Sequence, residues 1–205
     1  MPDSTVVLAV RHTDVHNPEN VFYGRLPRFH LSSLGEAQAE RTASYLATLP
    51  LAGIYVSPQL RARQTARAIA SQHQEVPIIV TWLLSEVFTS WQGTPFSVLG
   101  ANVNIYEPPK LPTDESIAMI FNRMNRALQR AAAEHPGQTT VLVSHADPIM
   151  VLRVGLQGQP LNFASIRAAN YPEKGSVTQF EIVPGEALPR VSYYDVQRQA
   201  LLATV

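Results

Sequence analysis

The sequence has no cysteine, so disulfide bonds and thiolate chemistry are excluded. It also has no long run of apolar residues and no signal peptide at its start, which predicts a protein without a membrane span or export signal. A cytoplasmic location is the resulting expectation.

Neither sign of charge is in excess, because 16 basic residues balance 16 acidic ones. This balance disfavours nucleic acids and anionic membranes as partners, so any affinity for anions must be local. The 205 residues, 45% of them apolar, suffice for one substantial core, whereas two domains would each be small. We therefore expect a single domain over residues 1–205, with the oligomeric state open and a homodimer as one alternative.

Three apolar, strand-like segments end in cationic or potentially reactive side chains. These are residues 6–10, followed by Arg11 and His12; residues 53–56, followed by Ser57 and Arg61; and residues 140–143, followed by Ser144 and His145. In open α/β sheets, ligands bind beyond the carboxyl ends of the strands, so these side chains are expected to meet there. Two arginines and two histidines in one crevice predict an anion site.

The motifs that contain these residues resemble, in order, those of the histidine phosphatase superfamily, the clan of the cofactor-dependent phosphoglycerate mutases. Residues 24–39 resemble its loop and first helix, 57–66 its second motif, 84–86 its acidic motif and 141–145 its last. The resemblance extends over most of residues 6–183. It implies an α/β three-layer sandwich with a mostly parallel mixed sheet, one antiparallel strand, and helices on both faces.

The resemblance also implies phosphoryl transfer, and the chemistry of a phosphomonoester explains the residue types. Arg11 and Arg61 are expected to clamp the phosphate oxygens, because a guanidinium stays charged and donates two hydrogen bonds. His145 would add a third donor, and His12 would attack phosphorus to form a phosphohistidine that water then hydrolyses. This scheme needs no metal and no cofactor, and its substrate is a small-molecule phosphomonoester.

Glu86 is the carboxyl group that the resemblance assigns to protonation of the leaving group, and Asn17 is a further expected phosphate contact. The sequence departs from the family pattern at Thr13 and Ala146, which replace the glycines that follow each histidine. Both are expected to contact the substrate and alter its fit, and Thr13 also disfavours a positive φ. The charged groups and the nucleophile are all retained, so an active phosphomonoesterase of the histidine acid phosphatase type is expected.

Three other functions remain open. A mutase of the phosphoglycerate type is the nearest, although residues 87–112 contain one cation, Lys110, where such enzymes carry arginines. A metal site at His12, Asp14 and His16 is disfavoured, because four-residue spacing joins two histidines only on a helix. The third is a non-catalytic domain that binds phosphorylated ligands.

Periodicity predicts where the main helices and last strands lie. Ser33 and Glu36 form a capping box that begins a helix ending near residue 48, and a buried stripe predicts a second helix over about 114–135, capped by Thr113. A further helix is expected from Asp147 to about residue 156. Strands are expected at 175–183 and 190–196, the latter at an edge. Aromatic residues in the loops 17–32 and 87–112 are expected to anchor those loops more than to contact ligand.

Overall fold

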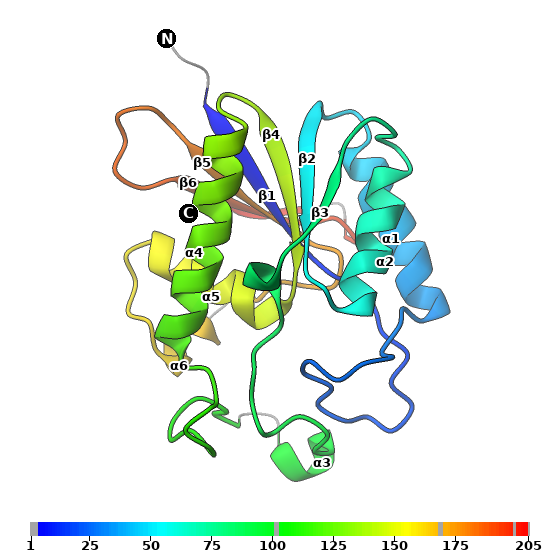
Figure 1. Ribbon diagram of the computed structural model, residues 1–205, viewed down its shortest axis with the longest axis vertical. Coiled ribbons are helices and arrows are strands. Elements are labelled where there is room, and N and C mark those ends of the chain that lie inside the picture. The colour runs from blue at the N-terminus through cyan, green and yellow to red at the C-terminus, as the bar shows by residue number, and fades with distance from the viewer. Residues whose placement is uncertain (1–3, 101–102, 168–169, 199, 205) are drawn as a thin grey trace.

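The computed structural model of the protein describes residues 4–100, 103–167, 170–198 and 200–204. Within these ranges the strands form one sheet with the order β3-β2-β4-β1-β5-β6-β7 (Figure 1). The strands are β1 (Thr5–Arg11), β2 (Leu51–Val56), β3 (Ile78–Val80), β4 (Thr139–Ser144), β5 (Val177–Ile182), β6 (Arg190–Asp195) and β7 (Ala200–Thr204). The helices are α1 (Ser33–Leu46), α2 (Leu60–Ala70), the 3-10 helix η1 (Trp82–Leu84), α3 (Phe96–Leu99), α4 (Ile117–Glu134), α5 (Ala146–Leu156) and α6 (Phe163–Ile166).

The sheet separates two apolar cores, because alternate residues of a strand point to opposite faces. On β1, Val7 and Ala9 join the core beneath α4 and α5, whereas Leu8 and Val10 join the core beneath α1 and α2. Figure 1 shows these two helix pairs on opposite sides of the sheet. The predicted three-layer sandwich is therefore confirmed.

The four strands β1 to β4 run parallel, so their carboxyl ends meet at one edge of the sheet. In register, Arg11 of β1 lies beside Ser144 of β4, which places the residues after these two strands side by side. Two expectations for the remaining strands were wrong. The resemblance implied one antiparallel strand, but both β5 and β7 run antiparallel to β1. The strand at 190–196 was expected at an edge, but β6 pairs with β5 on one side and with β7 on the other.

The helices begin at other residues than predicted. The side chain of Ser32, not Ser33, caps α1 by accepting a hydrogen bond from Gly35. Ser116 caps α4 in the same way, three residues after Thr113. Asp114 instead accepts two hydrogen bonds from Ser90, so it fixes the preceding loop. Several residues near each start are able to cap, and tertiary contacts select one of them.

Helix α5 is buried along almost its whole length, since it packs against α4 as well as the sheet. It begins at Ala146, one residue before the predicted start, and His145 occupies its N-cap position. No helix within the described residues has both the length and the apolar composition needed to cross a membrane.

Candidate active site

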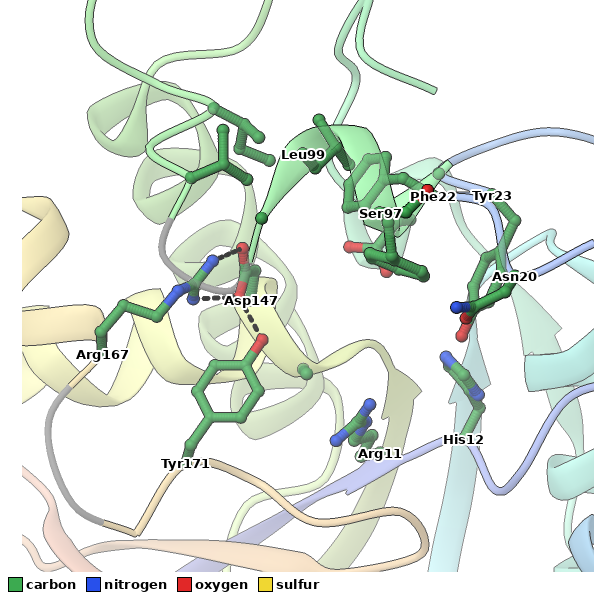
Figure 2. Close-up of a pocket in the computed structure, with 17 residues that line it drawn as sticks. Arg11, His12, Asn20, Phe22, Tyr23, Ser97, Leu99, Asp147, Arg167 and Tyr171 are labelled. Atoms are coloured by element: carbon green, nitrogen blue, oxygen red, sulfur yellow. Dashed lines mark hydrogen bonds and ion pairs between the residues drawn. The ribbon is translucent and has the colours of Figure 1, made fainter. Parts of the chain in front are cut away.

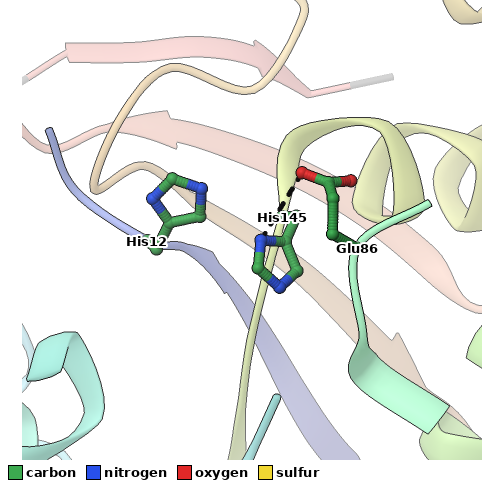
Figure 3. A group of neighbouring side chains, drawn as sticks. All are labelled: His12, Glu86 and His145. Atoms are coloured by element: carbon green, nitrogen blue, oxygen red, sulfur yellow. Dashed lines mark ion pairs between the residues drawn. The ribbon is translucent and has the colours of Figure 1, made fainter. Parts of the chain in front are cut away.

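The carboxyl ends of β1 and β4 bring His12 and His145 together (Figure 3), with their ring centroids 5.0 Å apart. Arg61 reaches the same point from the first turn of α2, and Glu86 from the loop after η1. His12, Arg61 and His145 are all buried, and the side chain of Glu86 is 13% exposed. Four of the five residues predicted to perform the chemistry therefore form one cluster, and Arg11 is the fifth.

Arg61 is the centre of this cluster. Its Nε donates to Nε2 of His12 at 3.2 Å, and its Nη2 lies 3.2 Å from Nδ1 of His145 and 3.8 Å from Oε2 of Glu86. The same Nη2 donates to the carbonyl of Gly24 at 2.7 Å, and the guanidinium stacks on Tyr23, 4.6 Å from its ring centroid. Because these contacts surround the guanidinium, its charge is held between the two histidines.

The hydrogen bonds of His12 determine which of its nitrogens is nucleophilic. Its Nδ1 lies 2.8 Å from the carbonyl oxygen of Thr13, which accepts only, so Nδ1 carries the proton. Its Nε2 carries no proton, and its lone pair accepts the hydrogen bond from Nε of Arg61. Burial, together with the charges of Arg61 and Arg11, lowers the pKa of His12 well below its usual value. The imidazole is therefore neutral near pH 7.

His145 carries its proton on the opposite nitrogen. Its Nδ1 faces Arg61, whereas its Nε2 lies 2.7 Å from Oγ of Ser57 and 3.2 Å from Oε1 of Gln59. Burial and the charge of Arg61 also lower the pKa of His145 well below its usual value. Ser57 and Gln59 thus orient His145. The sequence did not reveal this role, although both residues lie in a segment that it singled out.

Glu86 has the environment of a proton donor. Burial raises the pKa of its carboxyl group, and the charge of Arg61 opposes this effect only in part. Oε2 lies 3.5 Å from Nδ1 of His145, and Oε1 accepts from the backbone N–H of Val87 at 2.9 Å. The carboxyl group is therefore oriented, and it stays protonated to a higher pH than a solvated glutamate does.

Two arginines fix the backbone that carries Glu86, and no pattern in the sequence pointed to either. Nε of Arg25 donates to the carbonyl of Glu86 at 2.6 Å, and Arg123 of α4 donates to the carbonyls of Ser85 and Glu86 at 2.7 and 3.3 Å. Glu115 pairs with both guanidinium groups. The network links the loop 17–32 to α4 through the residue expected to act as the acid.

Arg11 is only partly committed to protein contacts. Its Nη1 donates to the carbonyl of Pro172 at 2.6 Å, whereas its Nε is buried and has no hydrogen-bond partner. An unpaired buried donor is costly, and a phosphate oxygen would satisfy it. Arg11 lines the same cavity as His12, which is consistent with the predicted clamp.

Three further residues were predicted to contact the substrate, Ala146, Thr13 and Asn17, and their side chains lie in different surroundings. Ala146 lines the cavity, at the first position of α5, where the backbone N–H groups favour an anion. Thr13 directs its hydroxyl to Thr65, 3.4 Å away, and its φ is not positive, so the strain expected there is absent. Asn17 uses its amide to hold the backbone of Val21. Of the residues predicted to bind the substrate, Arg11 and Ala146 line the cavity, whereas Thr13, Asn17, Arg61 and His145 do not.

Donor groups for a metal ion are also close together at this point. His12, Glu86 and His145 offer one ligand atom each within 4.8 Å of one another. Arg61 lies within hydrogen-bond distance of both histidines, however, and its positive charge opposes a second cation among them. The metal site considered at His12, Asp14 and His16 is not assembled either. Asp14 pairs with Lys174 and Ser32, and the ring of His16 stacks on that of His30.

The cluster opens into a cavity of about 710 Å³ (Figure 2). Figure 2 shows Arg11 and His12 at one end, Phe22 and Leu99 across from them, and Asp147, Arg167 and Tyr171 on a third side. Phe22, Tyr23 and Phe96 of the two aromatic loops line this cavity. The predicted nucleophile His12, the predicted acid Glu86 and the cation Arg11 thus line one bounded space.

The family is decided by a comparison with models of known families. Residues 7–192 match the model of the histidine phosphatase superfamily (branch 1). The chain belongs to this superfamily. Its curated relatives include an uncharacterized protein, Rv0525, of Mycobacterium tuberculosis, which is 34% identical over 171 residues that cover 78% of this chain and 83% of that protein. Phosphoserine phosphatase 1 of Hydrogenobacter thermophilus is 28% identical over 165 residues, or 76% of this chain and 78% of that enzyme.

Solved structures show the same fold. A phosphoserine phosphatase variant from Entamoeba histolytica, in complex with phosphoserine, superimposes with a TM-score of 0.76 and 21% identity over 96% of this chain and 100% of that one. The superfamily predicted from the motifs is therefore confirmed, and so is its phosphoglycerate mutase-like architecture.

Proposed function

We propose that this protein is a metal-independent phosphomonoester hydrolase that forms a phosphohistidine on His12. The observation that carries the proposal is the state of His12: its Nδ1 proton is engaged by the Thr13 carbonyl, so the unprotonated nitrogen is Nε2, which can attack once a phosphate oxygen takes over the hydrogen bond that Arg61 now donates to it. The phosphatases among its relatives support the same class of reaction.

In the first step, Nε2 of His12 attacks phosphorus as the bond from phosphorus to the leaving oxygen breaks. Arg11, which lines the cavity, donates to the phosphoryl oxygens, and the buried positive charge of Arg61 beside His12 offsets part of their negative charge. Glu86 donates its proton to the leaving oxygen, so the product departs as an alcohol and Glu86 becomes a carboxylate.

In the second step, water attacks the phosphohistidine and the carboxylate of Glu86 takes a proton from that water. The N–P bond breaks, inorganic phosphate forms, and both His12 and Glu86 return to their starting states. Every proton in this cycle moves through Glu86, so the two steps balance without a further acid or base.

The charges around the site favour hydrolysis over a mutase reaction. A mutase must hold a second anionic group of its substrate, whereas Arg25 is paired with Glu115 and Arg167 with Asp147. Arg11 and Arg61 are required for the reacting phosphate. Among the described residues that line the cavity, no further cation is available for a second phosphate.

The deciding experiment measures phosphate release from p-nitrophenyl phosphate and from alkyl phosphates in the presence of a chelator. We expect chelator-resistant hydrolysis by the wild type, and loss of activity with a retained fold in His12→Ala. A trapped phosphohistidine, detected by mass spectrometry in the wild type and absent from the variant, would establish the intermediate. Hydrolysis that survives in His12→Ala, or that stops on chelation, would refute the proposal.

A further inference from the structure

The cavity beyond the reacting groups is much larger than a small phosphoester requires. Its volume of about 710 Å³ lies within the range of sites that enclose ligands of drug size. A three-carbon leaving group, such as that of phosphoserine, would leave most of this space unfilled.

The wall across from Arg11 and His12 is largely apolar, with Ser97 and Asn20 as its polar members. Phe22 comes from the loop 17–32, Phe96 and Leu99 come from α3, and Ile105 follows α3 in the chain. Leu99 and Ile105 are buried, and the rings of Phe22 and Phe96 meet edge to face with centroids 6.1 Å apart. These side chains anchor the loops to each other, and they also present an apolar surface to any group that fills the cavity.

The third side of the cavity contains charges that cancel. Arg167 donates to both oxygens of Asp147, at 2.6 and 2.9 Å, and the hydroxyls of Tyr106 and Tyr171 donate to the same carboxylate. Burial alone would raise the pKa of Asp147, but these hydrogen bonds and the charge of Arg167 outweigh it and lower the pKa. Asp147 is therefore ionised and fully paired, so this side offers a substrate no net charge.

From these features we infer that the substrate is the phosphate ester of an uncharged, largely apolar alcohol, bulkier than serine or glycerate. The inference rests on the proposed function. A carboxylate on the leaving group would have to compete with Asp147 for Arg167, because Arg11 is taken by the phosphate. An apolar group would instead gain the contact surface of the wall, without any charge to desolvate.

The test compares kcat/KM for 2-phenylethyl phosphate, ethyl phosphate and phosphoserine, whose leaving groups are all primary alcohols. Burial of the phenyl group is expected to raise kcat/KM about 10- to 100-fold above that of ethyl phosphate. Phosphoserine is expected to be no better than ethyl phosphate. A preference for phosphoserine over 2-phenylethyl phosphate would overturn the inference.

Two variants of α3 test whether the wall is responsible. Leu99→Ala should lower the ratio of kcat/KM for 2-phenylethyl phosphate to that for ethyl phosphate by about 3- to 10-fold. Val98→Ala is the matched control, because Val98 is 71% exposed and does not line the cavity, so its ratio should not change. Equal ratios in Leu99→Ala and the wild type would refute this assignment of the wall.

A third variant tests the charge argument. Asp147→Asn leaves Arg167 without its counterion, so it should raise kcat/KM for phosphoserine relative to ethyl phosphate. An unchanged ratio in folded protein would refute the role of Asp147. p-Nitrophenyl phosphate distinguishes failure of the substrate inference from failure of the proposed function. If its hydrolysis depends on His12 but phosphoserine is preferred among the alkyl esters, the substrate class alone is overturned. If no ester is hydrolysed, the proposed function is overturned as well.

Discussion

Replacement of Glu86 by glutamine is expected to separate substrates by how much their leaving groups need a proton. Glutamine keeps the length of the side chain and an oxygen that accepts the Val87 N–H, now 2.9 Å from Oε1. It removes the acidic proton used in the first step and the carboxylate that takes a proton from water in the second. The variant should therefore fold and bind phosphate normally.

The expected loss is set by the contribution of general acid catalysis, roughly 10²–10⁴-fold, or about 2.7–5.4 kcal/mol in the activation barrier. This loss should apply in full to alkyl phosphates, whose alkoxide products are strongly basic. In kcat/KM, which reports the steps up to departure of the leaving group, it should be less than about tenfold for p-nitrophenyl phosphate, because p-nitrophenolate departs without protonation.

The pH profile gives a second, independent readout. As the acid, Glu86 must be protonated, so kcat/KM for alkyl phosphates should fall as pH rises through its raised pKa. As the nucleophile, His12 must be neutral, so activity should fall as pH drops through its lowered pKa. In Glu86→Gln the basic limb should disappear and the acidic limb remain.

The assay is steady-state release of phosphate from both ester types over a range of pH, with Glu107→Gln as the control. Glu107 is an exposed carboxylate in the loop 87–112, so its substitution should change neither rate nor profile. Equal losses on alkyl and p-nitrophenyl esters in Glu86→Gln would refute the assignment of Glu86 as the acid.

Three other substitutions test the surroundings of the reacting groups. Arg61→Ala should weaken inhibition by vanadate at least about 100-fold, since it removes a buried charge that serves ground and transition states alike. Arg63→Ala, on the exposed side of the same helix, should leave vanadate inhibition unchanged. Unchanged inhibition in Arg61→Ala would place that guanidinium outside the phosphate site. Arg123→Met should lower kcat for alkyl phosphates more than for p-nitrophenyl phosphate, with KM little changed, because Arg123 holds the backbone of Glu86. Arg123→Lys should recover part of this loss. Parallel losses on both esters would point to a purely structural role. Gly35→Ala should lower the free energy of unfolding by about 1–3 kcal/mol, and Tm by about 2–12 °C in thermal denaturation, since its Cβ would lie 2.0 Å from the carbonyl oxygen of Asp14; an unchanged Tm would contradict that contact.

The residues at the centre of the site were predictable because each lies at a strand end or in a short motif. Apolar runs identify the parallel strands, and parallel strands bring the residues at their carboxyl ends to one edge of the sheet. This reasoning predicted that His12, Arg61 and His145 would meet. The motif around Glu86 predicted its membership, but its raised pKa depends on burial, which the motif does not encode.

The groups that orient the site were not predictable in the same way. Arg123 lies in α4, more than 30 residues from the carbonyl groups it holds. The apolar periodicity that predicted this helix says nothing about the contacts of its polar residues. Ser57 and Gln59 were visible in a motif, but their contact with His145 requires that α2 and α5 begin side by side. The cap of α1 at Ser32 likewise depends on Asp14, which accepts from the Ser32 hydroxyl.

Sequence alone therefore determined the family, the layered α/β architecture and the candidate residues of the site, because these follow from local patterns along the chain. Tertiary structure alone decided which nitrogen of each histidine carries the proton, how Asp147 cancels the charge of Arg167, and how large the cavity is. The physical reason is that tautomers, pKa values and charge pairing depend on distances between residues that are remote in sequence, and only the packed chain sets those distances.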